Sequence, residues 1–98
     1  MNIRWTGPAA VALKSITDYV ARDNPPAAHR VAQRIKIAVS KLAEHPRLGR
    51  VGRVRDAYEL IIPGIPYIVA YRVRKLEVQI LSVYHTSREW PETFEEPA

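Results

Sequence analysis

Arginine recurs through one short stretch of the chain, RLGRVGRVRD at residues 47–56. The four arginines are Arg47, Arg50, Arg53 and Arg55, and only the last residue of the stretch is acidic. Guanidinium groups form paired hydrogen bonds with either carboxylates or phosphates. The stretch is therefore a candidate for binding an acidic protein or a nucleic acid. A solvated basic loop is the plain alternative, and contact with an acidic protein is the interpretation that we favour.

Other kinds of chemistry have little support in the sequence. There is no cysteine, which removes disulfides and thiolate metal sites. His29, His45 and His85 lie far apart and lack the close spacing of metal ligands. Gly49 and Gly52 have neither the following lysine nor the preceding strand of a phosphate-binding loop. We therefore predict no metal site and no cofactor.

The charge of the chain is strongly uneven. Its 98 residues include 15 lysines and arginines against 10 acids, for a net charge of +5. Four of the acids are gathered at the end, as Glu89, Glu92, Glu95 and Glu96. The part before them is therefore more basic than the total implies. A field of one sign on a small surface attracts polyanions or acidic proteins and speeds their encounter.

Two helices are predicted in the first half of the chain. The first begins near Pro8, which fits a first helical turn, and ends near Arg22. The second is capped by Asn24 and ends before Pro46. Its apolar stripe is Ala28, Val31, Ile35, Ala38 and Leu42. The short connection predicts an antiparallel helical hairpin.

Alternating apolar residues predict strands on both sides of the hairpin. Residues 1–5 form a first strand, and a meander of three strands follows Gly52. The residues assigned to one face of the meander are Val54, Tyr58, Leu60, Ile62, Tyr67, Val69, Tyr71, Val73, Val78 and Ile80. Ile61, Ile68, Leu81 and Val83 fall on the other face. That second face should be covered by the connection from the N-terminal strand or by a partner.

The order of elements predicts an α+β fold in which the helical hairpin packs on a small, mostly antiparallel sheet. Residues 1–90 form a single domain, and the acidic tail at residues 91–98 is expected to be mobile. Trp90 is expected to cover one end of the core, although an exposed tryptophan here would anchor a partner. No apolar run approaches the roughly 20 residues of a membrane helix, so we expect a cytoplasmic protein.

Five phrases of the sequence, in order, resemble the RelE/ParE superfamily of toxins from bacterial type II toxin–antitoxin modules. They are the first strand ending in Trp5 and Thr6, YVARDNPPAAHR, LAEHPRLGRVGRV, ELIIPGIPYIVAYRV and ILSVYHTSREWP. The resemblance covers nearly the whole chain. It implies a growth-inhibiting toxin that is neutralised by an acidic antitoxin, whose C-terminal segment wraps the toxin in a hetero-oligomeric complex.

The superfamily has two branches with different targets. RelE-like members cut messenger RNA on the ribosome, whereas ParE-like members inhibit DNA gyrase without known chemistry of their own. In the nuclease branch, a strand phrase of the type Tyr-Arg-Leu-Val-Tyr supplies a phosphate-binding arginine. The matching phrase here is YIVAY, and Ile68 stands at the arginine position. The resemblance therefore favours gyrase as the target slightly, and the ribosome-dependent endoribonuclease is the alternative.

A nuclease of this kind needs a general base, cations around the phosphate and a general acid. If the chain is a nuclease, the candidate catalytic residues are Arg55, Glu59, Arg72 and His85. We favour a structural role for His85 at the end of a strand. We also favour a surface ion pair of Glu59 with Arg55 or Arg72 across neighbouring strands.

Candidate residues for binding the antitoxin or the target are basic or aromatic. They are Arg47, Arg50, Arg53, Arg55, Arg72, Arg74, Tyr84, Arg88 and Trp90. A third hypothesis is a small nucleic-acid-binding domain without toxicity. It is disfavoured because no aromatic residues alternate with the arginines to form a stacking platform for bases.

Overall fold

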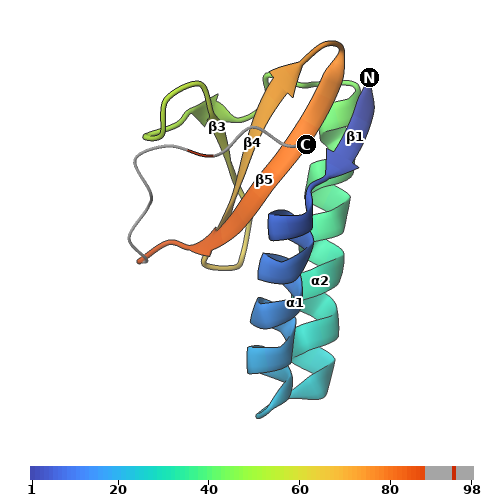
Figure 1. The fold of residues 1–98 in the computed structure, drawn as a ribbon. Helices are drawn as coiled ribbons and strands as arrows, with labels where there is room; N and C mark the ends of the chain where they lie inside the picture. The colour runs from blue at the N-terminus through green and yellow to red at the C-terminus, as the bar shows by residue number, and fades with distance from the viewer. Residues whose placement is uncertain (88–93, 95–98) are drawn as a thin grey trace.

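A helical hairpin covers one face of a five-stranded sheet (Figure 1). The computed structural model describes residues 1–87 and residue 94. Its elements are β1 (Asn2–Trp5), α1 (Gly7–Ala21), α2 (Pro25–Ser40), a short 3₁₀ turn η1 (Lys41–Ala43), β2 (Arg50–Val51), β3 (Tyr58–Ile61), β4 (Tyr67–Arg74) and β5 (Glu77–His85). The predicted α+β class, the helical hairpin and the three-stranded meander are confirmed.

The strands lie in the order β1-β5-β4-β3-β2. β3, β4 and β5 form the antiparallel meander, whereas β1 pairs with β5 in parallel, with Ile3 opposite Val78. Parallel strands cannot be joined by a tight turn. Here the helical hairpin and the strands β2, β3 and β4 lie between β1 and β5 in the chain. β2 adds only two residues to the outer edge of β3, and the sequence pattern did not predict it.

Both helices begin at a residue whose side chain caps them. Asn24 accepts a hydrogen bond from the backbone N–H of Ala27, as predicted from the sequence. Thr6, which we expected only to end the first strand, caps α1 by accepting a bond from the N–H of Ala9. The hydroxyl of Thr6 also donates to the carbonyl of Ile80 at 2.7 Å. This one side chain therefore fixes the start of α1 against β5.

The core lies between the hairpin and the sheet. From the helical side it receives Ala9, Ile35, Val39 and Leu42, and from the sheet it receives Leu60, Ile62, Tyr67, Val69, Tyr71, Val78, Ile80 and Val83. The apolar stripe predicted for α2 therefore packs as expected through Ile35, while Leu42 contributes from η1. Burial of each such large side chain stabilises the fold by about 1.5–3 kcal/mol.

A β-bulge changes the side to which the end of β5 points. Ala70 pairs with Ser82, but its neighbour Tyr71 pairs with Ile80, which leaves Leu81 as an extra residue. Beyond the bulge, the residue that packs with Val78 and Ile80 in the core is Val83. The alternation of the sequence had placed Val83 on the other face, and that prediction is wrong because the bulge reverses the parity.

The second face of the sheet carries a smaller apolar cluster, made of Val54, Ala57, Ala70 and Leu81. Tyr84 and Phe94 pack against it, so the loop before β3 and Phe94 supply the cover. The N-terminal strand's connection, our predicted cover, leads instead into the helices. Val54 was predicted on the helix-facing side, and this is wrong because a left-handed turn at Asp56 (φ 60°) separates Val54 from β3.

Candidate functional site

Glu59 organises the arginine-rich stretch from within the sheet. Its side chain lies on β3 and is only 2% exposed. Arg50 donates to Oε1 through Nη2 at 2.9 Å and through Nε at 3.2 Å. Arg53 donates to Oε2 through its backbone N at 2.8 Å and its Nε at 3.1 Å. Two of the four arginines are thus used to hold the stretch on β3.

These partners also set the protonation of Glu59. Burial raises the pKa of a carboxyl, but the backbone hydrogen bond from Arg53 and the side-chain bonds from Arg50 and Arg53 lower it. The net effect is a pKa below the ordinary value for glutamate. Glu59 is therefore ionised at neutral pH and acts as an internal counter-ion.

Tyr71 holds the beginning of the same stretch. Its hydroxyl donates to the carbonyl of Pro46 at 2.9 Å and accepts from the N–H of Gly49 at 2.8 Å. Its ring stacks on that of Tyr58 with the centroids 5.4 Å apart. Arg47 in turn donates to the hydroxyl of Tyr58 at 2.6 Å. Burial raises the pKa of Tyr71, so its phenol stays neutral and can donate the hydrogen bond to the carbonyl of Pro46.

The predicted binding arginines therefore lie in different environments. Arg47, Arg50 and Arg53 contact Tyr58 or Glu59, whereas Arg55 lies exposed on the turn before β3. The favoured surface ion pair of Glu59 with Arg55 is therefore wrong, because Glu59 is buried and pairs with Arg50 and Arg53. Arg74 is exposed at the end of β4. Arg88 and Trp90 lie outside the described residues.

The candidate nuclease residues are divided between the two faces of the sheet. Glu59 pairs across strands with Ala70 of the second-face cluster, and Arg72 lies two residues further along the same side of β4. Arg72 is buried, and its Nη2 donates to the carbonyl of Phe94 at 3.4 Å. The tyrosine predicted for binding, Tyr84, is also on this side, with its ring 6.1 Å from that of Phe94.

His85 lies on the opposite, helix-facing side. It is the cross-strand partner of Tyr67, whose ring it meets edge to face at 5.4 Å, and Tyr67 belongs to the main core. Its Nδ1 lies 2.8 Å from the hydroxyl of Ser87. The structure therefore brings Arg72 and Glu59 to one face of the sheet and His85 to the other.

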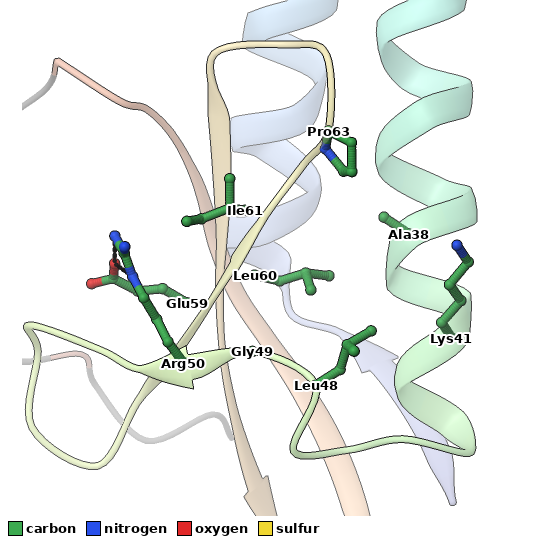
Figure 2. A pocket seen from close by; sticks show the side chains of 9 residues that line it. All are labelled: Ala38, Lys41, Leu48, Gly49, Arg50, Glu59, Leu60, Ile61 and Pro63. Atoms are coloured by element: carbon green, nitrogen blue, oxygen red, sulfur yellow. Dashed lines mark hydrogen bonds and ion pairs between the residues drawn. The ribbon is translucent and has the colours of Figure 1, made fainter.

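A groove lies between α2 and β3, beside the arginine-rich stretch (Figure 2). Its volume is about 350 Å³, and we call it the α2–β3 groove. It is lined by Ala38, Lys41, Leu48, Gly49, Arg50, Glu59, Leu60, Ile61 and Pro63. Figure 2 shows Lys41 and Arg50 on opposite sides of an apolar centre formed by Leu48, Leu60 and Ile61.

The exposed side of α2 continues this basic character. Arg30, Arg34, Ile37 and Lys41 follow one another at helical spacing and are all exposed. The Nη1 of Arg34 donates to the carbonyl of Pro63 at 3.0 Å, which ties α2 to the turn after β3. Gly64 suits this turn, because its φ is 80° and a Cβ there would overlap the guanidinium of Arg34.

Sequence reasoning did not find the α2–β3 groove or the two partners of Glu59. The groove lining comes from α2, η1, the arginine-rich stretch, β3 and the turn after it, and no local pattern joins these segments. The sequence contained one signal of the groove, since Ile61 is apolar but falls on the parity opposite to the core. In the structure its side chain is 50% exposed.

Among the described residues, no cluster of three or more potential ligands is suited to a metal ion. In the same part of the chain, no helix has the length and apolarity needed to span a membrane.

Comparison with known proteins gives a consistent result. Residues 3–90 match the family model described as the ParE toxin of the type II toxin–antitoxin system parDE. The protein Y4kP of Sinorhizobium fredii is 46% identical over 91 residues, covering 93% of this chain and 94% of Y4kP. Toxin RelE2 of Caulobacter vibrioides is 36% identical over 87 residues, covering 89% of this chain and 97% of that toxin.

A solved structure shares the fold. It belongs to the chromosomal ParDE toxin–antitoxin system of P. aeruginosa and aligns with a TM-score of 0.81 at 28% sequence identity. The alignment covers 89% of this chain and 97% of that one.

Proposed function

The chain belongs to the ParE toxin family of type II toxin–antitoxin systems, and from this premise we propose that it stops growth by binding DNA gyrase in the cytoplasm. The observation that carries this choice of target is the position of His85. It lies on the helix-facing side of the sheet, away from Glu59 and Arg72. General acid–base cleavage of RNA requires such groups around one phosphate.

Two further features support the same choice. Ile68, at the position of the nuclease arginine, is buried at 3% exposure and offers no charge to a phosphate. Glu59 is ionised but occupied by Arg50 and Arg53, so both of its oxygens already accept hydrogen bonds. A general base needs a free lone pair within reach of the substrate hydroxyl.

The toxin is held inactive by a cognate antitoxin. The solved relative of 28% identity comes from a ParDE toxin–antitoxin system. In this chain, the α2–β3 groove offers an apolar centre between Lys41 and Arg50, next to a basic face of α2. An acidic segment with apolar side chains is complementary to such a surface.

The test of the target is a supercoiling assay with purified gyrase. The chain is expected to inhibit supercoiling or to accumulate cleaved DNA, and the antitoxin from the adjoining reading frame should reverse the effect. A reaction with inactive gyrase serves as the control. A translation extract, run in parallel, shows whether the chain cuts messenger RNA. A normal supercoiling rate together with cuts in messenger RNA at codon-spaced positions would reassign the chain to the ribosome-dependent endoribonucleases.

A further inference from the structure

The outer edge of β5 is only partly covered. β1 pairs with β5 as far as Trp5 opposite Ile80, and the N–H of Thr6 donates to the carbonyl of Ile80 at 3.2 Å. The chain then turns away into α1. Within residues 1–87, no strand therefore lies beside the last part of β5 on this edge, at Val83 and His85.

The backbone groups of Val83 and His85 face this open edge. The N–H of Thr86 points toward β4, since it donates to the carbonyl of Pro66 at 3.0 Å. Backbone groups alternate in direction along a strand. Those of Tyr84 therefore face β4, whereas those of Val83 and His85 face outward. An uncovered edge of this kind can pair with a strand from another protein.

A groove separates this edge from α1. Its volume is about 650 Å³, and we call it the α1–β5 groove. Its lining includes Val11, Ser15 and Tyr19 of α1 and Val83 and His85 of β5. The three residues of α1 are four apart in the sequence, so they follow one side of the helix for about 12 Å. An extended segment of about four residues has the same length.

The α1–β5 groove is unusual in this basic chain because its lining is nearly uncharged. Among the described residues, none that lines it is a lysine, arginine, aspartate or glutamate. Arg22 stacks on the ring of Tyr19, with its Cζ 5.8 Å from the ring centroid, but is not part of the lining. Val11 and Tyr19 are each 67% exposed. Exposed apolar side chains beside an open strand edge indicate a protein-binding surface.

The lack of charge distinguishes between the candidate partners. The phosphates of a nucleic acid or the carboxylates of an acidic antitoxin would meet no lysine or arginine in the lining. A second copy of the chain would bring a net charge of +5 against another +5, and such repulsion keeps proteins monomeric. An uncharged, extended segment of a different protein fits both the groove and the edge.

We propose that the target protein adds an uncharged extended segment to the edge of β5 at Val83 and His85 and places apolar side chains in the α1–β5 groove. The inference rests on the proposed function, in which DNA gyrase is the target and supplies this segment. The added strand continues the line of β1 past the point where the chain turns into α1. The α2–β3 groove lies beyond β4, so binding of the target and of the antitoxin can be weakened separately.

Two matched pairs of variants test the groove. Val11→Glu and Tyr19→Glu each place a carboxylate in the uncharged lining and are expected to weaken inhibition of purified gyrase by about tenfold or more. Ala10→Glu adds the same charge at an exposed position of α1 outside the groove, and Leu76→Glu replaces an 81% exposed apolar residue between β4 and β5. These two controls are expected to change inhibition by less than about threefold. All four should bind the antitoxin as the wild type does, which also shows that they fold.

Amide hydrogen exchange tests the added strand. Exchange is followed by mass spectrometry, with fragmentation to single residues, for the chain alone and in the presence of excess gyrase. We expect the amides of Val83 and His85 to exchange about 100-fold or more slowly in the complex, since each N–H gains a partner. The amide of Tyr84, which already faces β4, serves as the internal control and should change far less.

The outcomes separate this inference from the proposed function. Full inhibition of gyrase by both Val11→Glu and Tyr19→Glu would overturn the location of the segment and leave the target intact. Inhibition with unchanged exchange at Val83 and His85 would overturn the added strand. Loss of antitoxin binding in the groove variants, or a dimer of the free chain that Tyr19→Glu dissociates, would assign the groove to another occupant and overturn the inference. Failure of the wild-type chain to bind or inhibit gyrase would overturn both proposals.

Discussion

At the scale of single residues, the most informative side chain is a buried acid in a basic protein. Glu59 was considered from the sequence as a general base or as a surface partner of Arg55 or Arg72. The structure shows it buried and paired with Arg50 and Arg53. Those partners become visible only once β2 is known, because its register places Arg50 directly opposite Glu59.

Replacing this acid should destabilise the fold. Glu59→Gln removes the charge from a group that receives hydrogen bonds from Arg50 and Arg53. Hydrogen bonds to charged groups contribute roughly 1.5–3 kcal/mol, and the half-exposed arginines place the loss toward the lower end. We expect the free energy of unfolding in urea at pH 7 to fall by about 1–2 kcal/mol. Glu44→Gln, at an exposed acid, is the control and should have little effect.

The same variant has a pH signature. Because the folded-state pKa of Glu59 is lowered, its stabilisation is fully present above the unfolded value of about 4.3 and is lost as the pH falls through the folded value. The wild type should therefore lose more stability than Glu59→Gln between neutral and acid pH. Parallel stability curves for the two proteins over that range would show that the carboxylate contributes nothing.

At the scale of elements, Gly49 determines how closely the arginine-rich stretch approaches the sheet. A Cβ at this position would lie 2.7 Å from the Tyr71 hydroxyl oxygen and 2.8 Å from the carbonyl oxygen of Glu59. Gly49→Ala should therefore push the stretch away from β3 and cost about 1–3 kcal/mol of stability. Gly7→Ala is the matched control, since a Cβ there meets nothing within 4 Å. Equal melting temperatures for the two variants would contradict this account.

The elements themselves were predictable to different degrees. Both helices could be placed from the sequence because Asn24, Pro8 and Pro25 are local signals that act through the first turn. β2 and the bulge could not be placed. Two residues carry no periodicity, and the extra residue Leu81 depends on how β4 pairs with β5 rather than on its own neighbours.

At the scale of the whole molecule, the uneven charge should govern how fast the antitoxin is captured. Attraction between a basic toxin and an acidic partner raises the association rate and is screened by salt. We expect the association rate constant to fall by about tenfold or more between 0.05 and 0.5 M NaCl, with a much smaller change in dissociation. Stopped-flow mixing measures both constants, and Lys41→Glu should reduce the slope. A salt-independent association rate would exclude electrostatic capture.

The two-layer arrangement of the molecule could be foreseen, whereas the candidate site could not. A hairpin with one apolar side and a sheet with one apolar side have to pack together, whatever the details of their pairing. The α2–β3 groove depends on where five separate segments end. Its position follows from tertiary contacts such as Tyr71 with Gly49 and Arg34 with Pro63, which no local pattern encodes.

The single additional residue at Leu81 makes the end of β5 sensitive to length as well as to composition. Deleting Leu81 would remove the bulge and restore simple alternation without turning the residues that follow, so Val83 and His85 would still face the helices and Ser82 and Tyr84 the second face. If Leu81 were instead paired in regular alternation, all four residues would change sides. A homologous chain without the bulge can therefore be aligned across this strand only with a one-residue gap at Leu81 or Ser82, since an alignment without the gap superimposes residues from opposite sides of the sheet.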